Sequence, residues 1–378
     1  MNICYVHSAD FTKHKGSSIH VKELVRNLSL LHTIVLVVDK WDGSFMETVT
    51  ILEMNCPRFL KIVWRTVFSA VYAARALLFS DINLLYAKSP LEGVILCILG
   101  KIFNVPVVYE VNGLIKEESK MKNENRFRVV GSVFLEYVVV NCADHLICVT
   151  PWIKENLVSR GISAQRLSVV ENGADTVLFQ YIDNARTILG LDPDKYYVGY
   201  TGTLKAWQGL EYILDAVPFI LERELETEFL IVGGGELYDW LHQSIREKTL
   251  SCITVTGEVK HEKVPLYISA CDVCLLLKKP LSSGYSPLKL YEYMGCERPV
   301  VASAVKGFEC LEKEKAGILV NQTDPEEVAD AVIMLLRDKI LRKEMGKRGR
   351  EYVVKNHTWE KVAQKISDIC TQTVHKKR

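Results

Sequence analysis

The sequence predicts an α/β protein with two parallel β-sheets. Apolar runs bounded by turn residues alternate with segments of helical period from end to end, which is typical of parallel sheets covered by helices on both faces. The chain has 378 residues, too many for one ordinary core, so we expect two Rossmann-like domains of similar size. Residues 175–194 have only a weak pattern and are the expected linker.

Each half of the chain supplies one series of alternating elements. Strands of the first sheet are expected at residues 2–6, 33–38, 83–86, 107–111, 145–149 and 167–170, with helices at 18–31, 60–79, 90–103, 126–142 and 151–160. Strands of the second sheet are expected at residues 197–200, 229–232, 253–256, 273–277, 299–302 and 317–320, followed by helices at 325–337, 340–356 and 359–372. We expect the basic end, HKKR, to be a frayed tail.

Composition excludes several classes of protein. A net charge of +1 gives no basic excess for nucleic acid and no acidic tail. The start of the chain lacks the pattern of a signal peptide, and no window reaches the roughly 20 apolar residues of a membrane-spanning helix. We therefore expect a cytoplasmic protein.

The eleven cysteines indicate reduced, buried thiols, because they are scattered through apolar segments. Cys271 and Cys274 form one CxxC without a second pair. The surrounding CDVCLLL favours a core strand over a redox or zinc site.

The segment SPLKLYEYMGCERPVVAS combines a helix start with a buried strand. Ser286 is a suitable N-cap and Pro287 suits the first helical position, so a helix is predicted from here to Gly295. The preceding Gly284 and serines keep the approach small, and the first-turn N–H groups can then face an anion such as diphosphate.

The carboxylate of Glu292 lies about a turn and a half along the predicted helix from this anion site. Lys289 and Glu292 share one face of the predicted helix. Glu292 can accept hydrogen bonds from both ribose hydroxyls of a nucleotide. An amphipathic helix with a surface Lys–Glu pair is the alternative.

Three further loops follow strands, where ligands bind in open parallel sheets. Each loop also has a simpler structural explanation: an N-cap, a solvated lysine or a tight turn. Their candidate residues are Gly16 and Ser17 in the first loop, Gly202, Thr203 and Lys205 in the second, and Gly233 and Gly234 in the third.

Taken together, the segments resemble the family-four retaining glycosyltransferases, which have the GT-B fold of two Rossmann-like domains facing across a cleft. The resemblance rests on the order and spacing of GSSIHVKELVRNL, VVYEVNG, VVENGADTVLF, YTGTLKAWQGLEYILDAV, LIVGGGEL, the SPxKLxEYM form and HTWEKVA. It implies an acceptor domain at 1–175 and a nucleotide-sugar domain at 176–357, with the C-terminal helix 358–374 packing back on the first.

The implied activity is transfer of a hexose from a nucleotide diphosphate sugar, such as a UDP- or GDP-sugar, to a glycan or lipid-linked acceptor. The departing diphosphate would take the acceptor proton while helix N–H groups and Lys205 stabilise its charge. No cofactor or metal is implied, and the Asp192–x–Asp194 pattern is better explained as a turn. The implied donor-binding residues are Glu292, Ser286, Pro287, Leu288, Lys289, Gly284, Tyr285, Gly202, Thr203, Gly233, Gly234, Gly16, Ser17 and Asn172.

Three departures from the family pattern involve four positions. Gly284 stands where the family commonly has a sugar-contacting glutamate, and Thr203 and Gln208 stand where it has an arginine and a lysine. Asn112 replaces a histidine. We expect Glu110 and Asn112 to contact sugar hydroxyls, although a structural role at the end of a strand explains them as well.

The acceptor is indicated only by residues 58–75, which mix basic and apolar side chains in an amphipathic pattern. A core helix with snorkelling basic residues explains this pattern as well as a membrane interface does. The membrane interpretation predicts a peripheral protein that acts in surface polysaccharide or glycolipid synthesis. The rival functions are a nucleotide-sugar epimerase of the same fold and a non-catalytic partner subunit.

Overall fold

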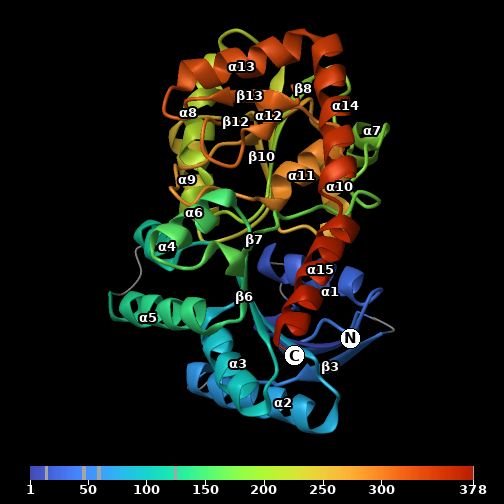
Figure 1. Cartoon of the computed structure of the whole chain (residues 1–378). Coiled ribbons are helices and arrows are strands. Elements are labelled where there is room, and N and C mark those ends of the chain that lie inside the picture. The colour runs from blue at the N-terminus through green and yellow to red at the C-terminus, as the bar shows by residue number, and fades with distance from the viewer. Residues whose placement is uncertain (13–15, 45–47, 58–60, 123–125, 378) are drawn as a thin grey trace. The chain divides into compact units, whose positions relative to one another are not determined.

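The computed structural model describes residues 1–12, 16–44, 48–57, 61–122 and 126–377. The chain separates into two compact units (Figure 1). Unit 1 contains Met1–Asn172 and Trp359–Arg378, and unit 2 contains Gly173–Thr358.

Unit 1 is built on a seven-stranded parallel sheet in the order β3-β2-β1-β4-β5-β6-β7. Its strands are β1 (Asn2–Asp10), β2 (Thr33–Lys40), β3 (Val49–Glu53), β4 (Leu84–Ala87), β5 (Val107–Val111), β6 (His145–Cys148) and β7 (Leu167–Val169). Its helices are α1 (Gly16–Leu28), α2 (Lys61–Phe79), α3 (Pro90–Phe103), α4 (Ile115–Lys122), α5 (Arg126–Cys142), α6 (Pro151–Ser159) and α15 (Trp359–Lys377). The order reverses between β1 and β4, which makes that pair the switch point of the sheet.

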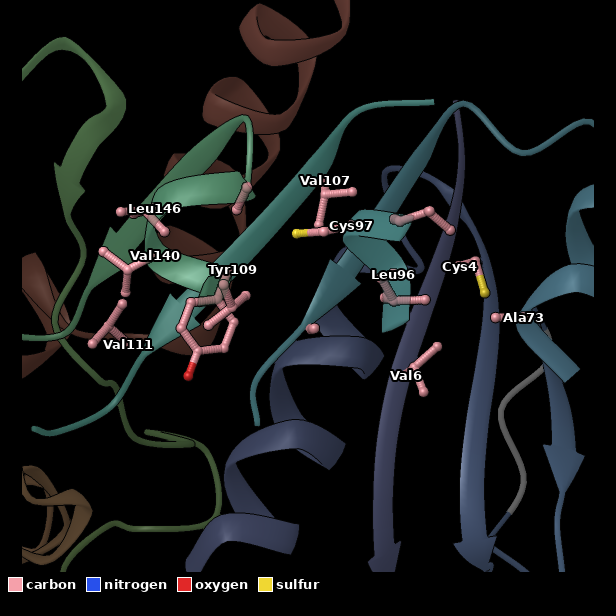
Figure 2. Close-up of a cluster of buried hydrophobic side chains, with 14 of the residues drawn as sticks. Cys4, Val6, Ala73, Leu96, Cys97, Val107, Tyr109, Val111, Val140 and Leu146 are labelled. Atoms are coloured by element: carbon pink, nitrogen blue, oxygen red, sulfur yellow. The ribbon is translucent and has the colours of Figure 1, made fainter. Parts of the chain in front are cut away.

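The core of unit 1 lies between the sheet and the helices on one face. Val6 on β1, Leu96 on α3, Tyr109 on β5 and Val140 on α5 are all buried there (Figure 2). The strands are apolar on consecutive residues because helices cover both faces of the sheet.

Unit 2 repeats this plan with a six-stranded parallel sheet in the order β10-β9-β8-β11-β12-β13. Its strands are β8 (Tyr196–Thr201), β9 (Thr227–Val232), β10 (Ile253–Gly257), β11 (Val273–Leu276), β12 (Val300–Ser303) and β13 (Gly317–Val320). Its helices are α7 (Ala185–Leu189), α8 (Leu210–Leu221), α9 (Tyr238–Glu247), α10 (Val264–Ala270), α11 (Leu288–Gly295), α12 (Cys310–Lys313), α13 (Pro325–Arg337) and α14 (Lys339–Asn356). Here the switch point lies between β8 and β11.

The prediction that HKKR forms a frayed tail is wrong. Helix α15 continues through Lys377, whose ammonium group lies 3.0 Å from the Asp144 carboxylate. The helix packs on α1 (Figure 1), and His32 Nε2 lies 2.7 Å from Ser367 Oγ. Tertiary contacts therefore hold the basic end in place.

Several short elements were not predicted. Strand β3 and helices α4 and α7 have too few patterned residues to stand out. Helix α7 lies inside the predicted linker, where Arg186 fixes it by donating to the carbonyl of Ala270 and to the Asp272 carboxylate. In the described part of the chain, no helix has both the length and the apolar character needed to cross a bilayer.

Candidate functional site

The switch point of unit 2 carries a cluster of polar side chains. Lys278 follows β11, Tyr200 lies near the end of β8, and Gln208 lies in the loop between β8 and α8. Lys289 comes from the first turn of α11. Because the carboxyl ends of parallel strands meet at one edge of the sheet, these groups come together there.

Two ammonium groups share one amide oxygen in this cluster. Lys278 Nζ lies 2.8 Å from Gln208 Oε1, and Lys289 Nζ lies 3.1 Å from the same atom. Lys289 also donates to the Tyr200 hydroxyl at 2.9 Å. Neighbouring buried cations are costly, so this arrangement is typical of a site that binds an anion with several charges.

Burial lowers the pKa of both lysines. The pKa of the Lys278 ammonium falls to about 7. The pKa of Lys289 falls well below its ordinary value because of burial and the charge of Lys278, while Glu292 opposes the shift. Strongly perturbed groups at a switch point indicate a functional site.

Glu292 lies on α11, one turn beyond Lys289. Burial raises the pKa of its carboxyl to about 7, although Lys289 opposes the shift. The next residue, Tyr293, fixes the helix against β8, because its hydroxyl accepts from the Thr201 N–H at 2.8 Å. The carboxylate is thus held near the lysine pair by a buried hydrogen bond.

The predicted start of α11 is wrong by one residue. Pro287 is the N-cap, with extended φ and ψ of −80° and 132°, and the helix begins at Leu288 rather than Pro287. The ψ of Pro287 itself is extended rather than helical, so the first helical residue is Leu288. The predicted end at Gly295 is confirmed.

Glycines let the loops after β8 and β9 approach Lys289 and each other closely. Gly202 has φ +134°, and a Cβ there would lie 2.6 Å from Lys289 Nζ. Gly233 has φ +144°, and its Cβ would meet the Gly202 carbonyl oxygen at 2.0 Å. Close approach therefore explains these two glycines. A Cβ at Gly234 would lie 2.7 Å from Glu258 Cγ.

The remaining predicted residues of unit 2 surround this cluster. Lys205 lies over the ring of Trp207, 4.7 Å from its centroid, and the Thr203 carbonyl accepts from the Tyr200 hydroxyl. Tyr285 places its ring 5.0 Å from Lys278 Nζ. Ser286 and Leu288 are half-buried beside it.

Gly284 has φ +66°, a left-handed conformation that favours glycine. The loop that carries it is closed by a hydrogen bond from its N–H to the Leu281 carbonyl. A glutamate at this position would strain the backbone, which gives a physical reason for the departure seen in the sequence.

Unit 1 has its own polar cluster, centred on the Glu110 carboxylate at the end of β5. Oε1 lies 2.9 Å from His20 Nε2 and 3.5 Å from Lys88 Nζ, and it accepts from Asn112 Nδ2 at 2.8 Å. Oε2 accepts from the Tyr86 hydroxyl at 2.7 Å. Glu110 is buried, whereas Asn112 is exposed.

The partners of Glu110 keep it ionised. Burial opposes ionisation, but the charges of His20 and Lys88 and the hydrogen bonds from His20 and Tyr86 hold the pKa of Glu110 well below its ordinary value. A carboxylate of this kind is a weak base and a strong orienting group. Asn172, the last residue of the first segment of unit 1, also hydrogen-bonds to His20.

Gly16 and Ser17 lie apart from these hydrogen bonds, as exposed residues in the first turn of α1. Asp192 accepts from the Asp194 N–H at 3.0 Å, which confirms the predicted turn. Cys271 and Cys274 are buried thiols of unit 2. Among the described residues, no group of three His, Cys, Asp or Glu side chains is placed to hold a metal ion.

Sequence reasoning missed several members of the two clusters, namely His20, Lys88, Tyr200 and Lys278. The two lysines could have been found from their positions in the sequence, because Lys88 and Lys278 each come directly or almost directly after a buried strand. Both lysines are separated from their partners by long stretches of sequence. Only the strand order reveals that they lie at switch points.

Two family models match consecutive parts of the chain. Residues 14–178 match "Glycosyltransferase Family 4" and residues 195–338 match "Glycosyl transferases group 1". An uncharacterized glycosyltransferase of Methanocaldococcus jannaschii is 23% identical over 362 residues, which cover 94% of this chain and 93% of the relative.

Two solved structures share the fold across 98% of this chain. Sucrose-phosphate synthase from Thermosynechococcus elongatus has a TM-score of 0.85 at 22% identity, over 98% of its own chain. The Anabaena protein HepE in complex with UDP-glucose has a TM-score of 0.79 at 18% identity, over 100% of its chain. The fold is GT-B, and the two partial family matches together with the relative support a glycosyltransferase.

Proposed function

We propose that this glycosyltransferase moves a hexose from a nucleotide diphosphate sugar to a glycan or lipid-linked acceptor, with retention at the anomeric carbon. The observation that carries the donor assignment is the pair of ammonium groups on Gln208 at the switch point of unit 2. The UDP-glucose bound to HepE, a protein of the same fold, supports a sugar nucleotide as donor.

In the proposed complex, Lys278 and Lys289 contact the diphosphate and Glu292 accepts from the ribose hydroxyls. Each charge-assisted hydrogen bond contributes about 1.5–3 kcal/mol. The first-turn N–H groups of α11 add to the positive field, because Pro287 has no side-chain acceptor for them. The anion compensates the repulsion between the two lysines.

The proposed mechanism uses the leaving group as the base. As the bond between the anomeric carbon and the diphosphate breaks, the departing oxygen takes the acceptor proton and the new glycosidic bond forms on the same face. Lys278 and Lys289 stabilise the charge that grows on this oxygen. Lys205, which lies over the Trp207 ring, is proposed as an additional cation.

Glu110 is proposed as a positioning residue in unit 1. Its carboxylate orients the exposed Asn112 amide through the 2.8 Å hydrogen bond, and Asn112 is then the group that contacts a sugar hydroxyl. A synthetic role in a surface polysaccharide or glycolipid follows from a lipid-linked acceptor, which would place the enzyme at the cytoplasmic face of a membrane.

A donor panel tests this function. UDP-, GDP- and other nucleotide sugars are incubated with the protein and membrane extract, with nucleotide release as the first readout. The anomeric configuration of the product is then determined by NMR. Transfer with retention supports the proposal, whereas inversion, epimerisation of the donor without an acceptor, or nucleotide binding without turnover would overturn it.

A further inference from the structure

Three helices of unit 1 form a continuous layer on one face of its sheet. Helix α3 packs against both α2 and α5, so the three lie side by side in the order α2-α3-α5 (Figure 1). Their inner sides contribute Ala73, Leu96 and Val140 to the core. Their outer sides are exposed and are unusual in composition.

The outer side of α5 is an apolar stripe. Phe127, Val130, Phe134 and Tyr137 are spaced by three, four and three residues, which places them on one helical face. Their exposed fractions are 89%, 68%, 63% and 67%. Soluble monomers seldom expose contiguous large apolar side chains, and such a surface indicates a binding partner.

Helices α2 and α3 extend this stripe. Val63, Val67 and Val71 recur at every fourth residue of α2 and are exposed, and Trp64 beside them is 36% exposed. Ile98 and Ile102 repeat the same spacing on α3, and both are exposed. We call the exposed apolar side chains of α2, α3 and α5 the apolar layer.

The exposed charges of these helices have one sign. Arg75, Lys101, Arg126 and Arg128 are exposed. The acidic residues of the three helices are Glu92 and Glu136, and both are buried. Across the described residues of α2, α3 and α5, an exposed apolar surface is thus accompanied by cations alone.

We propose that the apolar layer docks on the surface of an anionic lipid bilayer. Apolar side chains at the interface and cations facing anionic headgroups are the pattern of a peripheral membrane surface. A second copy of the chain fits less well, because a symmetric contact would place the cations of both copies against each other. The proposal deepens the proposed function by placing the lipid-linked acceptor and the enzyme at one surface.

Flotation of the full-length protein with lipid vesicles tests the proposal. We expect the protein to float with vesicles that contain phosphatidylglycerol and far less with pure phosphatidylcholine vesicles. Raising the salt from 0.1 to 0.5 M should reduce flotation, because the Debye length shortens from about 10 Å to a few ångströms.

Matched variants test whether vesicle binding depends on the apolar layer or on exposed apolar and basic residues anywhere on the protein. Phe127→Ser/Phe134→Ser and, separately, Arg126→Gln/Arg128→Gln should each lower the bound fraction at least threefold. Leu225→Ser/Ile340→Ser removes two exposed apolar side chains of unit 2, and Lys343→Gln/Lys347→Gln removes two exposed cations there. Both control pairs should bind like the wild type.

The result that would overturn the proposal is equal recovery of wild type and variants with anionic vesicles. Absence of vesicle binding would also overturn it, and analytical ultracentrifugation would then assign the layer to self-association if Phe127→Ser/Phe134→Ser dissociates a dimer. Glu292→Ala should float like the wild type, so failure of the donor site and failure of membrane docking are distinguishable.

Discussion

Lys278 and Lys289 meet at the unit 2 switch point, where both ammonium groups lie within 3.1 Å of Gln208 Oε1. The two residues come from different elements, the end of β11 and the first turn of α11. We propose that this pair supplies the positive charge that the family resemblance implies at Thr203 and Gln208. The donor assignment therefore depends on this pair more than on Lys205.

Removal of Lys278 should weaken nucleotide binding. Lys278→Met deletes one charge-assisted hydrogen bond to the diphosphate, so UDP or GDP affinity should fall by about 1.5–3 kcal/mol, roughly 10- to 150-fold. Lys248→Met changes an exposed lysine paired with Asp215 and serves as the control. Calorimetric titration measures both, and equal affinities would remove Lys278 from the site.

Nucleotide binding should depend on pH in two directions. The Lys278 ammonium has a pKa of about 7 and must be charged to bind the anion, so affinity should fall as the pH rises above 7. The Glu292 carboxyl also has a pKa of about 7 and must be ionised to accept from ribose, so affinity should fall below that pH. Lys278→Met should weaken the alkaline limb and leave the acid limb unchanged, because Lys289 still contributes a titrating cation.

Above pH 7 the free energy of unfolding should rise with pH, whereas nucleotide affinity falls. The pKa of Lys278 is lower in the folded protein than in the unfolded chain, so the unfolded state binds more protons between the two values and stability rises with pH there. Urea unfolding between pH 7 and pH 10 measures this trend. If the free energy of unfolding depends on pH equally in the wild type and in Lys278→Met, this prediction is contradicted.

Loss of the Glu292 carboxylate should cost about 2 kcal/mol or more of nucleotide affinity, because two charged hydrogen bonds disappear. Glu312→Ala, which removes an exposed carboxylate of α12, is the matched control. Thermal unfolding verifies that both variants fold. Unchanged affinity in folded Glu292→Ala would show that this carboxylate lies outside the nucleotide site.

A methyl group at Gly202 should displace Lys289. Gly202→Ala forces an alanine to φ +134° and places its Cβ 2.6 Å from Lys289 Nζ, so we expect a stability loss of about 1–3 kcal/mol together with weaker nucleotide binding. Gly131→Ala is the control, because no heavy atom lies within 4 Å of its Cβ. Chemical unfolding and calorimetry report the two effects separately.

Glu110→Ala should destabilise unit 1 by about 3–5 kcal/mol, because His20 and Lys88 lose the charge that compensates them. Glu110→Gln keeps acceptors for Tyr86 and should cost less. Because the pKa of Glu110 is lowered by folding, its contribution is complete at neutral pH and is lost as the pH falls. Urea unfolding at pH 7 and pH 4 checks the sign, and an alanine variant as stable as the wild type would contradict this role.

The sequence was sufficient for the elements with a strong local pattern. The helix Pro325–Arg337 was predicted to the residue, because Asp324 caps it and accepts from the N–H groups of Glu326 and Glu327. Lys289 and Glu292 were identified because the residues that start their helix are consecutive in the sequence. Elements and contacts of this kind depend on neighbours within a few positions.

The remainder depends on residues far apart in the chain. Gln208 stands 70 residues from Lys278 and 81 from Lys289, and the strand order that joins them has no local signature. The tail at Lys377 is ordered by Asp144, 233 residues away. From the sequence, Gly284 could be described only as the loss of a glutamate. The structure shows that its φ of +66° favours glycine.

Calorimetric titration of UDP and GDP into the wild type and into Lys278→Met/Lys289→Met tests the central claim most directly, namely that unit 2 binds a nucleotide diphosphate through its lysine pair. We expect the wild type to bind at least one of the two nucleotides and the folded double variant to bind it at least 100-fold more weakly. Equal binding by both proteins would contradict the claim.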